Sequence, residues 1–191
     1  MPENPERRAS LGDAAIRVIA GEGCRGLTHR AVDREAGVPI GTAVNYHRTR
    51  EDLLIAAAGR LIGPEVVERS DIGPAEVTEA GLRALLQGLV AVAVEGPLFL
   101  VTFELLLEGV RRPRLRDVLT ELNRAELAAI TARFAAAGHP LDGDDLSRAT
   151  AALYGVIFGL LTGVPSLGED VARAEVDDIA SRLWAAMNEI R

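Results

Sequence analysis

The stretch from Leu27 to Leu54, LTHRAVDREAGVPIGTAVNYHRTREDLL, constrains the fold more than any other part of the sequence. It predicts two short helices separated by Gly37, because glycine readily adopts the left-handed backbone conformation that ends one helix and turns into the next. Thr28 is a suitable N-cap for the first helix, since its side-chain oxygen can accept a hydrogen bond from an otherwise unpaired backbone N–H. The second helix is expected over residues 40–47. The stretch therefore predicts two short helices joined at a tight corner.

This order of short helix, glycine-containing turn and short helix is typical of helix-turn-helix DNA-binding units. A helix that enters the major groove needs small side chains at its N-terminal end, and Gly41, Thr42 and Ala43 meet that need. Asn and Thr side chains suit base edges, and Arg side chains suit phosphate oxygens. Ordinary helical hairpins share the pattern, so a hairpin without DNA binding stays open on these residues alone.

The run GVPIGTAVNYHRTREDLL, residues 37–54, resembles the N-terminal domain of TetR-family transcriptional regulators. The detailed resemblance covers residues 8–55, and the helical pattern of the remaining chain extends it. The sequence departs from the family pattern at three positions. Val44 stands where many members have a phosphate-contacting Tyr, His47 replaces the usual Phe, and Arg50 replaces Lys. We expect His47 to be a packed core side chain.

The resemblance implies which residues contact DNA. Thr42 and Asn45 are expected to read base edges, and Ile40 is expected to touch a thymine methyl group. Gly41 lets the backbone approach the bases. Contacts to phosphates are expected from Thr28, Tyr46, Arg48 and Arg50. The implied partner is a double-stranded DNA operator.

The rest of the chain is helical in pattern, with apolar residues recurring at the spacing of one helix face. It includes a connector helix expected over residues 50–62 and a strongly apolar helix over residues 98–109 that we expect to be buried centrally. The sequence thus predicts an all-α protein of about nine helices. Its three-helix helix-turn-helix domain is expected over residues 1–50, and its effector-binding and dimerisation domain over residues 51–191. The segments expected to lack helix are residues 1–7, the turn at 22–26 and a polar linker at 65–73, with the next helix opening at Pro74.

Charge is divided unevenly along the chain, whose net charge is −7. Residues 1–63 contain 9 Arg and 8 acidic residues, so the acidity belongs to the later residues. Cys24 is the single cysteine, which excludes a disulfide framework and a cysteine-based metal site. No signal-peptide pattern or membrane-spanning apolar run is present, so a cytoplasmic protein without cofactor, metal or membrane partner is expected.

Two apolar stripes near the C-terminus, over residues 144–163 and 170–190, are more than one small domain needs to cover itself. We infer that they pair with a second copy as a four-helix bundle, in keeping with the preference of proteins for two-fold homodimers. An entirely internal core is the alternative. The expected interface residues are Ala152, Gly155, Gly159, Ile179, Leu183, Trp184 and Met187.

The resemblance also implies a small-molecule effector held between central helices. Glu104 stands out, because an acidic residue inside an apolar run needs a partner such as Arg83, Arg124 or a cationic ligand. The other candidates are residues of a kind that is more often plain core than ligand contact. The candidate effector contacts are Gln87, Phe99, Phe103, Glu104, Asn123, Tyr154 and Phe158.

The expected function is that of a ligand-responsive regulator, a repressor released from a palindromic operator by its effector. Three alternatives stay open: an activator, a regulator whose ligand strengthens DNA binding, and a helical ligand-binding protein without DNA binding. An enzyme is the least favoured class, because the three histidines are scattered and no catalytic set can be assembled. The acidic group Asp142, Asp144 and Asp145 is expected to cap a helix rather than to bind a cation.

Overall fold

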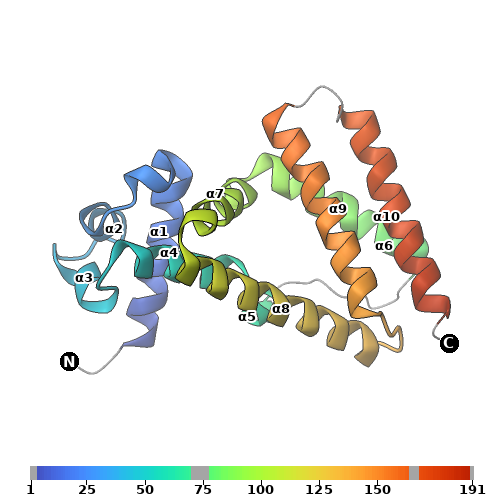
Figure 1. The fold of residues 1–191 in the computed structure, drawn as a ribbon, viewed down its shortest axis with the longest axis horizontal. Coiled ribbons are helices and arrows are strands. Elements are labelled where there is room, and N and C mark those ends of the chain that lie inside the picture. Colours follow the sequence, from blue (N-terminus) through green and yellow to red (C-terminus); the bar gives the residue numbers. More distant parts are fainter. Residues whose placement is uncertain (1–3, 70–77, 164–167, 190–191) are drawn as a thin grey trace. The chain divides into compact units, whose positions relative to one another are not determined.

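The computed structural model describes residues 4–69, 78–163 and 168–189, and every regular element in them is a helix (Figure 1). This confirms the expected all-α class. The ten helices are α1 (Pro5–Gly26), α2 (His29–Glu35), α3 (Thr42–Tyr46), α4 (Arg50–Leu61), α5 (Pro64–Arg69), α6 (Glu79–Glu95), α7 (Leu98–Arg111), α8 (Pro113–Ala136), α9 (Gly143–Thr162) and α10 (Glu169–Glu189).

The helices form two compact units. Unit 1 comprises residues 1–66 and 100–124, and unit 2 comprises residues 67–99 and 125–191. Unit 1 therefore contains α1 to α4 together with most of α7 and the first half of α8. Packing in this unit continues beyond residue 50, because α7 and α8 contribute to the same core as α1 and α4. The functional boundary at residue 50 remains a prediction.

The core of unit 1 is built where α1 crosses α4. Leu11 of α1 and Leu53 and Leu54 of α4 are fully buried there. Gly12 permits the close approach of the two helices, because a Cβ atom at this position would lie 3.2 Å from the backbone oxygen of Ala56. The same core extends to buried side chains of α7 and α8, so α4 is held on both sides within unit 1.

Helix α1 differs from the expectation at both ends. It begins at Pro5, and the Asn4 side chain accepts a hydrogen bond from the backbone N–H of Arg7 (3.0 Å), so residues 5–7 are helical rather than disordered. At its other end the sequence predicts a turn over residues 22–26, but the helix continues across a kink at Gly23 (φ 69°, ψ 174°). A single left-handed glycine therefore makes the change of direction.

The expected polar linker at residues 65–73 is also partly helical. Pro64 to Arg69 form α5, in which Val67 is buried. The remaining linker residues and Pro74 lie outside the described residues. Helix α6 follows with Thr78 as its N-cap, whose hydroxyl accepts from the backbone N–H of Gly81 (3.0 Å).

Helix α7 is less completely buried than its apolar sequence predicts. Val101 and Leu105 are fully buried, whereas Leu107 and Val110 are 64% and 70% exposed. The helix thus turns one face into the core of unit 1 and leaves the other uncovered. Within the described ranges, no single helix is long and apolar enough to cross a membrane, and α6 and α7 reach that length and composition as a broken pair taken together.

The first turn of α4 is stabilised by a capping box. The Thr49 hydroxyl accepts from the backbone N–H of Asp52 (3.1 Å), and the Asp52 carboxylate accepts from the backbone N–H of Thr49 (2.9 Å). Arg114 of α8 donates to the other oxygen of Asp52 (2.6 Å). Burial alone would raise the pKa of Asp52, but the hydrogen bonds from Arg114 and Thr49 outweigh it and lower the pKa to about 2.

Replacing this carboxylate should destabilise unit 1 in a pH-dependent way. We expect Asp52→Ala to lower the free energy of unfolding by about 1 kcal/mol at pH 7, the usual effect of losing a helix cap. Because the folded-state pKa lies below the unfolded value of 3.8, this contribution is present above pH 3.8 and is lost as the pH falls toward 2. Urea unfolding at pH 7 and pH 3 measures it. Equal losses at both pH values would contradict the assignment, and Asp117→Ala, an exposed acidic residue on α8, is the matched control.

Unit 2 is a packed set of helices in which α10 lies against α6 and α9. The sequence predicts Ile179, Leu183 and Met187 at a dimer interface, but a single chain already buries them to 1%, 5% and 1% exposure. The reason is that this stripe of α10 turns inward onto its own neighbours. Ile179, Leu183 and Met187 therefore pack within their own chain, and the dimer interface stays a prediction.

Candidate nucleic-acid interface

The corner between α2 and α3 has the backbone conformation that the sequence requires. Gly37 (φ 64°) and Gly41 (φ 94°) both lie in the left-handed region. Thr28 caps α2, with its hydroxyl accepting from the backbone N–H of Ala31 at 3.1 Å. Helix α3 is shorter than the predicted 40–47, because Gly41 is its left-handed N-cap and His47 is already extended (φ −132°, ψ 95°).

Asp33 fixes the start of α3 and was not recognised in the sequence as a functional residue. Its carboxylate is 1% exposed and accepts from the backbone N–H of Gly41 and of Ala43, each at 2.7 Å. These donors belong to the beginning of a helix that has no side-chain cap of its own. A carboxylate suits that position, since the first backbone N–H groups lack helical partners and carry partial positive charge. Asp33 therefore holds the start of α3 against α2.

A sequence signal for this role does exist. Asp33 directly follows Ala31 and Val32, which are buried on the inner face of α2, so an acidic side chain at this place points inward and needs donors. Gly41 follows eight residues later, within reach across the corner. An inward-facing Asp before a glycine corner is thus the pattern that would have revealed it.

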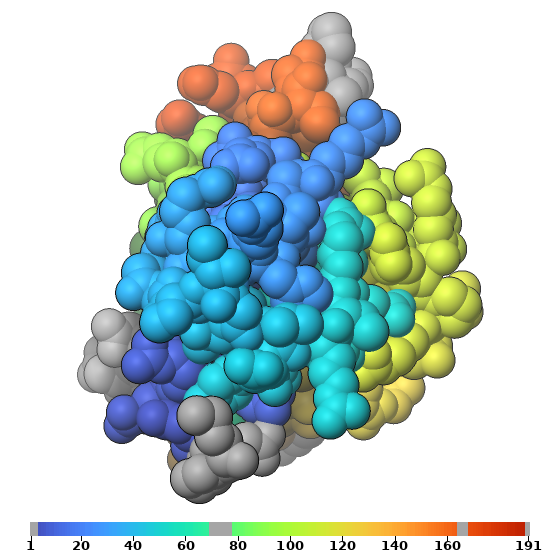
Figure 2. All heavy atoms as spheres, turned by 90° about the vertical axis from the view of Figure 1, so that its left-hand side faces the viewer, coloured from blue at the N-terminus to red at the C-terminus, as the bar shows by residue number. Residues whose placement is uncertain are grey.

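The outer face of α3 presents several predicted base-reading residues. Ile40 is 74% exposed and Asn45 is exposed, whereas Ala43 on the opposite face is fully buried. The Thr42 hydroxyl donates to the backbone oxygen of Pro39 (2.6 Å), so its oxygen lone pairs and methyl group are what it can offer to a base. Figure 2 views the molecule from this side, with α2 and α3 in blue to cyan.

Three of the predicted phosphate contacts flank this face. The Thr28 hydroxyl uses its oxygen for the cap and keeps its hydrogen for donation. The Arg8 guanidinium lies over the ring of Tyr46, 6.0 Å from the ring centre. Arg48 is exposed, and within the described residues it makes no hydrogen bond or ion pair. The structure thus brings Thr28, Tyr46 and Arg48 to the surroundings of α3.

Arg50 lies apart from this group. Its guanidinium donates to the backbone oxygens of Leu27 (3.1 Å) and Cys24, and it lies 3.9 Å from the carboxylate of Glu108 on α7. These contacts tie the start of α4 to the connection between α1 and α2. A phosphate could take this guanidinium only in competition with them.

The seven candidate effector residues fall into different units. Phe103, Glu104 and Asn123 belong to unit 1, and Gln87, Phe99, Tyr154 and Phe158 belong to unit 2. Within unit 2, Gln87 lines a pocket of about 520 Å³ between α6 and α10 and donates to Asp177 at 2.8 Å.

Glu104 does not pair with either arginine expected from the sequence. Its carboxylate accepts from the backbone N–H of Cys24 at 2.5 Å, a donor exposed by the kink at Gly23. Arg83 instead contacts Glu79 and Asp177, and Arg124 contacts Glu121. The expectation of an arginine partner for Glu104 is therefore wrong, because its donor is a backbone group 80 residues away in the sequence.

An aromatic pair with a nearby carboxylate is the most distinctive feature among the candidates in unit 2. The rings of Phe99 and Tyr154 meet edge to face with their centres 5.8 Å apart. Burial and, to a smaller extent, the negative charge of Glu126 on α8 raise the pKa of Tyr154 to about 12. The pair and the carboxylate come from α7, α8 and α9.

Comparison with known proteins agrees with this architecture. A family model described as "Tetracyclin repressor-like, C-terminal domain" matches residues 73–186. A stretch of 59 residues is 42% identical to the HTH-type transcriptional regulator BetI of Rhizobium meliloti (strain 1021). This stretch is 31% of the chain and 29% of BetI, so the match spans under a third of that curated relative.

Solved structures match over nearly the whole chain. The multidrug binding protein EbrR complexed with proflavin is 30% identical, with 91% of this chain and 99% of that chain covered and a TM-score of 0.60. A transcriptional regulator from Streptomyces coelicolor A3(2) is 21% identical over 94% of this chain and 99% of that one, with a TM-score of 0.68, which shows the fold alone. The family model covers more than half of the chain, and the protein therefore belongs to the TetR family of transcriptional regulators.

Proposed function

We propose that the protein is a homodimeric repressor that binds a near-palindromic operator through the α3 helices of its two copies and is released by a small-molecule effector. The observation that carries this proposal is the outward face of α3, held in place by Asp33. In a two-fold dimer, two such helices meet successive turns of the major groove about 34 Å apart. Residues 1–50 would then form the DNA-binding domain and residues 51–191 the effector-binding and dimerisation domain.

The proposed DNA contacts follow from exposure and remaining hydrogen-bonding capacity. Thr42 and Asn45 read base edges, Ile40 contacts a thymine methyl group, and Gly41 allows close approach. Thr28, Tyr46 and Arg48 contact phosphates, which position the protein without reading sequence. Arg50 stabilises the DNA-binding unit through its hydrogen bonds to the backbone oxygens of Leu27 and Cys24.

For the dimer we propose the outward face of α9. Gly155 and Phe158 are exposed there, Phe158 to 44%, whereas Ala152 and Trp184 are partly buried and pack against the core of unit 2. Gly159, by contrast, is buried within the single chain. An exposed glycine next to an exposed aromatic ring suits the close approach of a second helix.

Gly155→Arg should convert dimers to monomers. Nothing lies within 4 Å of a Cβ atom at Gly155, so the single chain accommodates the new side chain, whereas a helix packed against this face would not. We expect the dimer dissociation constant to rise by at least about 100-fold, which is about 2.7 kcal/mol. Analytical ultracentrifugation measures it. Gly88→Arg on α6 also meets open space and is the matched control; dimers that persist in Gly155→Arg would place the interface elsewhere.

For the effector we propose a planar aromatic cation. EbrR, at about 30% identity, has been crystallised with proflavin and with ethidium, both of this class. In this chain, Phe99 and Tyr154 offer aromatic faces, and Glu126 offers the negative charge that a bound cation requires. The same groups would discriminate against anions.

Ethidium binding to the protein without DNA tests the effector class. Fluorescence titration should show saturable binding that Glu126→Gln weakens by about tenfold, a change of about 1.4 kcal/mol. Glu121→Gln, on the same helix but 72% exposed at its side chain, is the control. If Glu126→Gln binds ethidium as the wild type does, this carboxylate is not part of the site.

A reporter gene tests the direction of the response. Its promoter overlaps an operator that has been obtained by selecting bound sequences from random duplex DNA. A repressor predicts low expression that rises when ethidium is added to the cells. An activator predicts that expression requires the protein. A regulator whose ligand strengthens DNA binding predicts that ethidium lowers expression, and either of these two results would overturn the release mechanism.

A further inference from the structure

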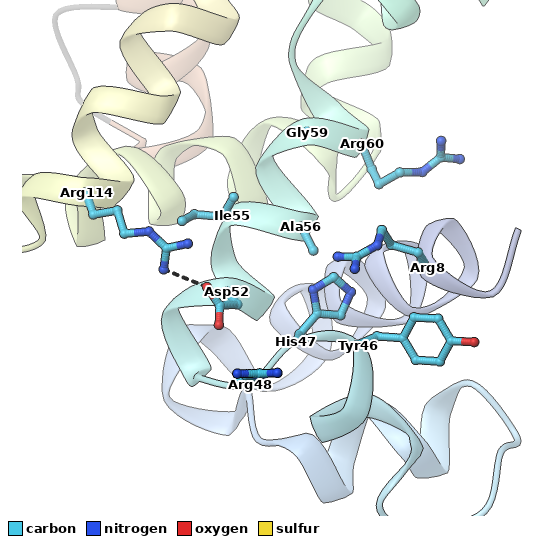
Figure 3. A pocket seen from close by; sticks show the side chains of 10 residues that line it. All are labelled: Arg8, Tyr46, His47, Arg48, Asp52, Ile55, Ala56, Gly59, Arg60 and Arg114. Atoms are coloured by element: carbon cyan, nitrogen blue, oxygen red, sulfur yellow. Dashed lines mark hydrogen bonds and ion pairs between the residues drawn. The ribbon is translucent and has the colours of Figure 1, made fainter. Parts of the chain in front are cut away.

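A basic pocket lies in unit 1 beside the recognition helix (Figure 3). Its volume is about 470 Å³, and its lining residues come from α1, α4, α8, the end of α3 and the segment that follows α3. Its size falls within the range of sites that hold small molecules. One wall is apolar and consists of Ile55, Ala56 and Gly59 of α4, so the pocket combines a hydrophobic wall with a charged lining.

Positive charge dominates the lining. Four guanidinium groups, those of Arg8, Arg48, Arg60 and Arg114, face a single lining carboxylate, that of Asp52. Arg114 is paired with that carboxylate, and Arg60 is paired at 2.6 and 3.1 Å with Asp13, which lies outside the lining. Around the lining, Asp13 and Glu65 act on Arg60 and Glu51 lies 4.0 Å from Arg114, so the excess of positive charge belongs to the groups that line the pocket. The pocket therefore favours an anion.

His47 supplies a second and independent sign of a ligand. The residue is 4% exposed and lines the pocket, yet its Nε2 atom has no hydrogen-bond partner within the described part of the chain. Figure 3 shows the ring among the lining side chains, near Arg8. A buried polar atom without a partner costs about 1–3 kcal/mol. A ligand hydroxyl can donate to Nε2 when that atom is unprotonated, and a phosphate oxygen can accept from it when it carries the ring proton, so either group would remove that cost.

The groups around the His47 ring act on its pKa in both directions. Burial lowers the pKa of His47, and the positive charge of Arg8 lowers it further. A hydrogen bond with the Arg8 backbone and the charge of Asp52 act in the opposite direction, while His29 adds to the lowering. An anion placed between the ring and the guanidinium groups would offset the repulsion from Arg8.

We propose that this pocket binds the phosphate group of a phosphorylated small molecule. Arg48 and His47 would contact the phosphate oxygens, with the other guanidinium groups supplying the positive surroundings. A phosphate monoester carries about −1.5 to −2 charges at pH 7 and three acceptor oxygens, which suits this lining. Because α1, α4 and the end of α3 all contribute walls, occupancy would act directly on the recognition helix. The proposal requires neither an effector in unit 2 nor sequence-specific DNA.

The test is a substitution whose larger side chain fills the pocket without a clash. Gly59 lies in its wall, and a Cβ atom there meets nothing within 4 Å, so Gly59→Leu occupies the space without a clash. Leucine also favours helix over glycine, so α4 should remain folded. Gly88→Leu on α6 of unit 2 is the matched control, since it also meets open space. Both variants are made in the full chain.

Inorganic phosphate is titrated at constant ionic strength and pH 7.5, and binding is followed by calorimetry. We expect saturable binding to the wild type and to Gly88→Leu, and at least tenfold weaker binding to Gly59→Leu. Equal binding to Gly59→Leu, or equal displacement of phosphate by chloride at the same ionic strength, would overturn the proposal, because the lining would then act by charge alone.

Two further measurements identify the source of the phosphate. If it is a small molecule, adenosine monophosphate binds with the same sensitivity to Gly59→Leu, and this variant keeps the wild-type affinity for a duplex of arbitrary sequence. If it is the DNA backbone, Gly59→Leu weakens binding to every duplex, and inorganic phosphate competes with the duplex. The second pattern would overturn the proposal, because the pocket would then be part of the DNA interface already proposed.

Discussion

Asp33→Ala should greatly weaken binding to the operator while leaving most of the protein folded. The substitution removes the acceptor of two backbone donors, the N–H groups of Gly41 and Ala43. Ala43 is fully buried, so its N–H cannot turn to water instead. Each hydrogen bond to a charged group contributes about 1.5–3 kcal/mol, and we expect the free energy of unfolding to fall by about 3 kcal/mol. Loss of the fixed α3 should lower operator affinity by about 100-fold or more.

Urea unfolding and fluorescence anisotropy with a labelled operator measure the two effects. Glu35→Ala is the matched control, an acidic residue on the same helix whose partner Arg17 is exposed at the surface. Its loss should cost less than about 1 kcal/mol. An Asp33→Ala protein that binds operator as tightly as the wild type would show that the carboxylate does not position α3.

Asn45→Ala should remove base discrimination without removing attraction to DNA. Asn45 is exposed on α3 and carries no charge, so its contribution lies in hydrogen bonds to a base edge. A bidentate contact of this kind discriminates by about 1–3 kcal/mol, roughly a 5- to 150-fold preference at one position of each half-site. Binding to arbitrary duplexes should stay unchanged, because it depends on charge.

Arg48→Ala provides the opposite pattern and so serves as the comparison. It should weaken binding to all duplexes alike and lower the slope of affinity against salt concentration by about one unit. For both variants, competition with a set of single-base operator variants measures the base preference, and repeating it at two salt concentrations measures the salt dependence of the affinity. If Asn45→Ala keeps the wild-type preference at every position, Asn45 does not read a base.

The helical course of the chain could be predicted because it rests on local rules. Apolar spacing, caps such as Thr28 and Thr49, and the left-handed glycine at residue 37 all depend on neighbours in the sequence. The same rules identified the corner of the helix-turn-helix. They placed the start of α3 too early, because the left-handed conformation of Gly41 depends on Asp33, whose bonds cross the corner.

Contacts between distant segments were not predictable in this way. The family resemblance implies that Arg50 contacts a phosphate, yet its guanidinium donates to backbone oxygens 23 and 26 residues away. Glu104 accepts a hydrogen bond from the backbone N–H of Cys24, next to the Gly23 kink, instead of pairing with an arginine. On α10 the apolar stripe was visible in the sequence, but which neighbour it packs against depends on the placement of α6 and α9.

Selection of bound sequences from a pool of random duplex DNA tests the central claim most directly. The purified protein is mixed with the pool at moderate salt, and the retained duplexes are sequenced over several rounds. The proposed dimeric regulator predicts enrichment of a two-fold symmetric site with half-sites about one helical turn apart, and a changed half-site for Asn45→Ala. Retention that is blind to sequence, or no retention at all, would contradict sequence-specific binding by α3 of the ligand-free protein.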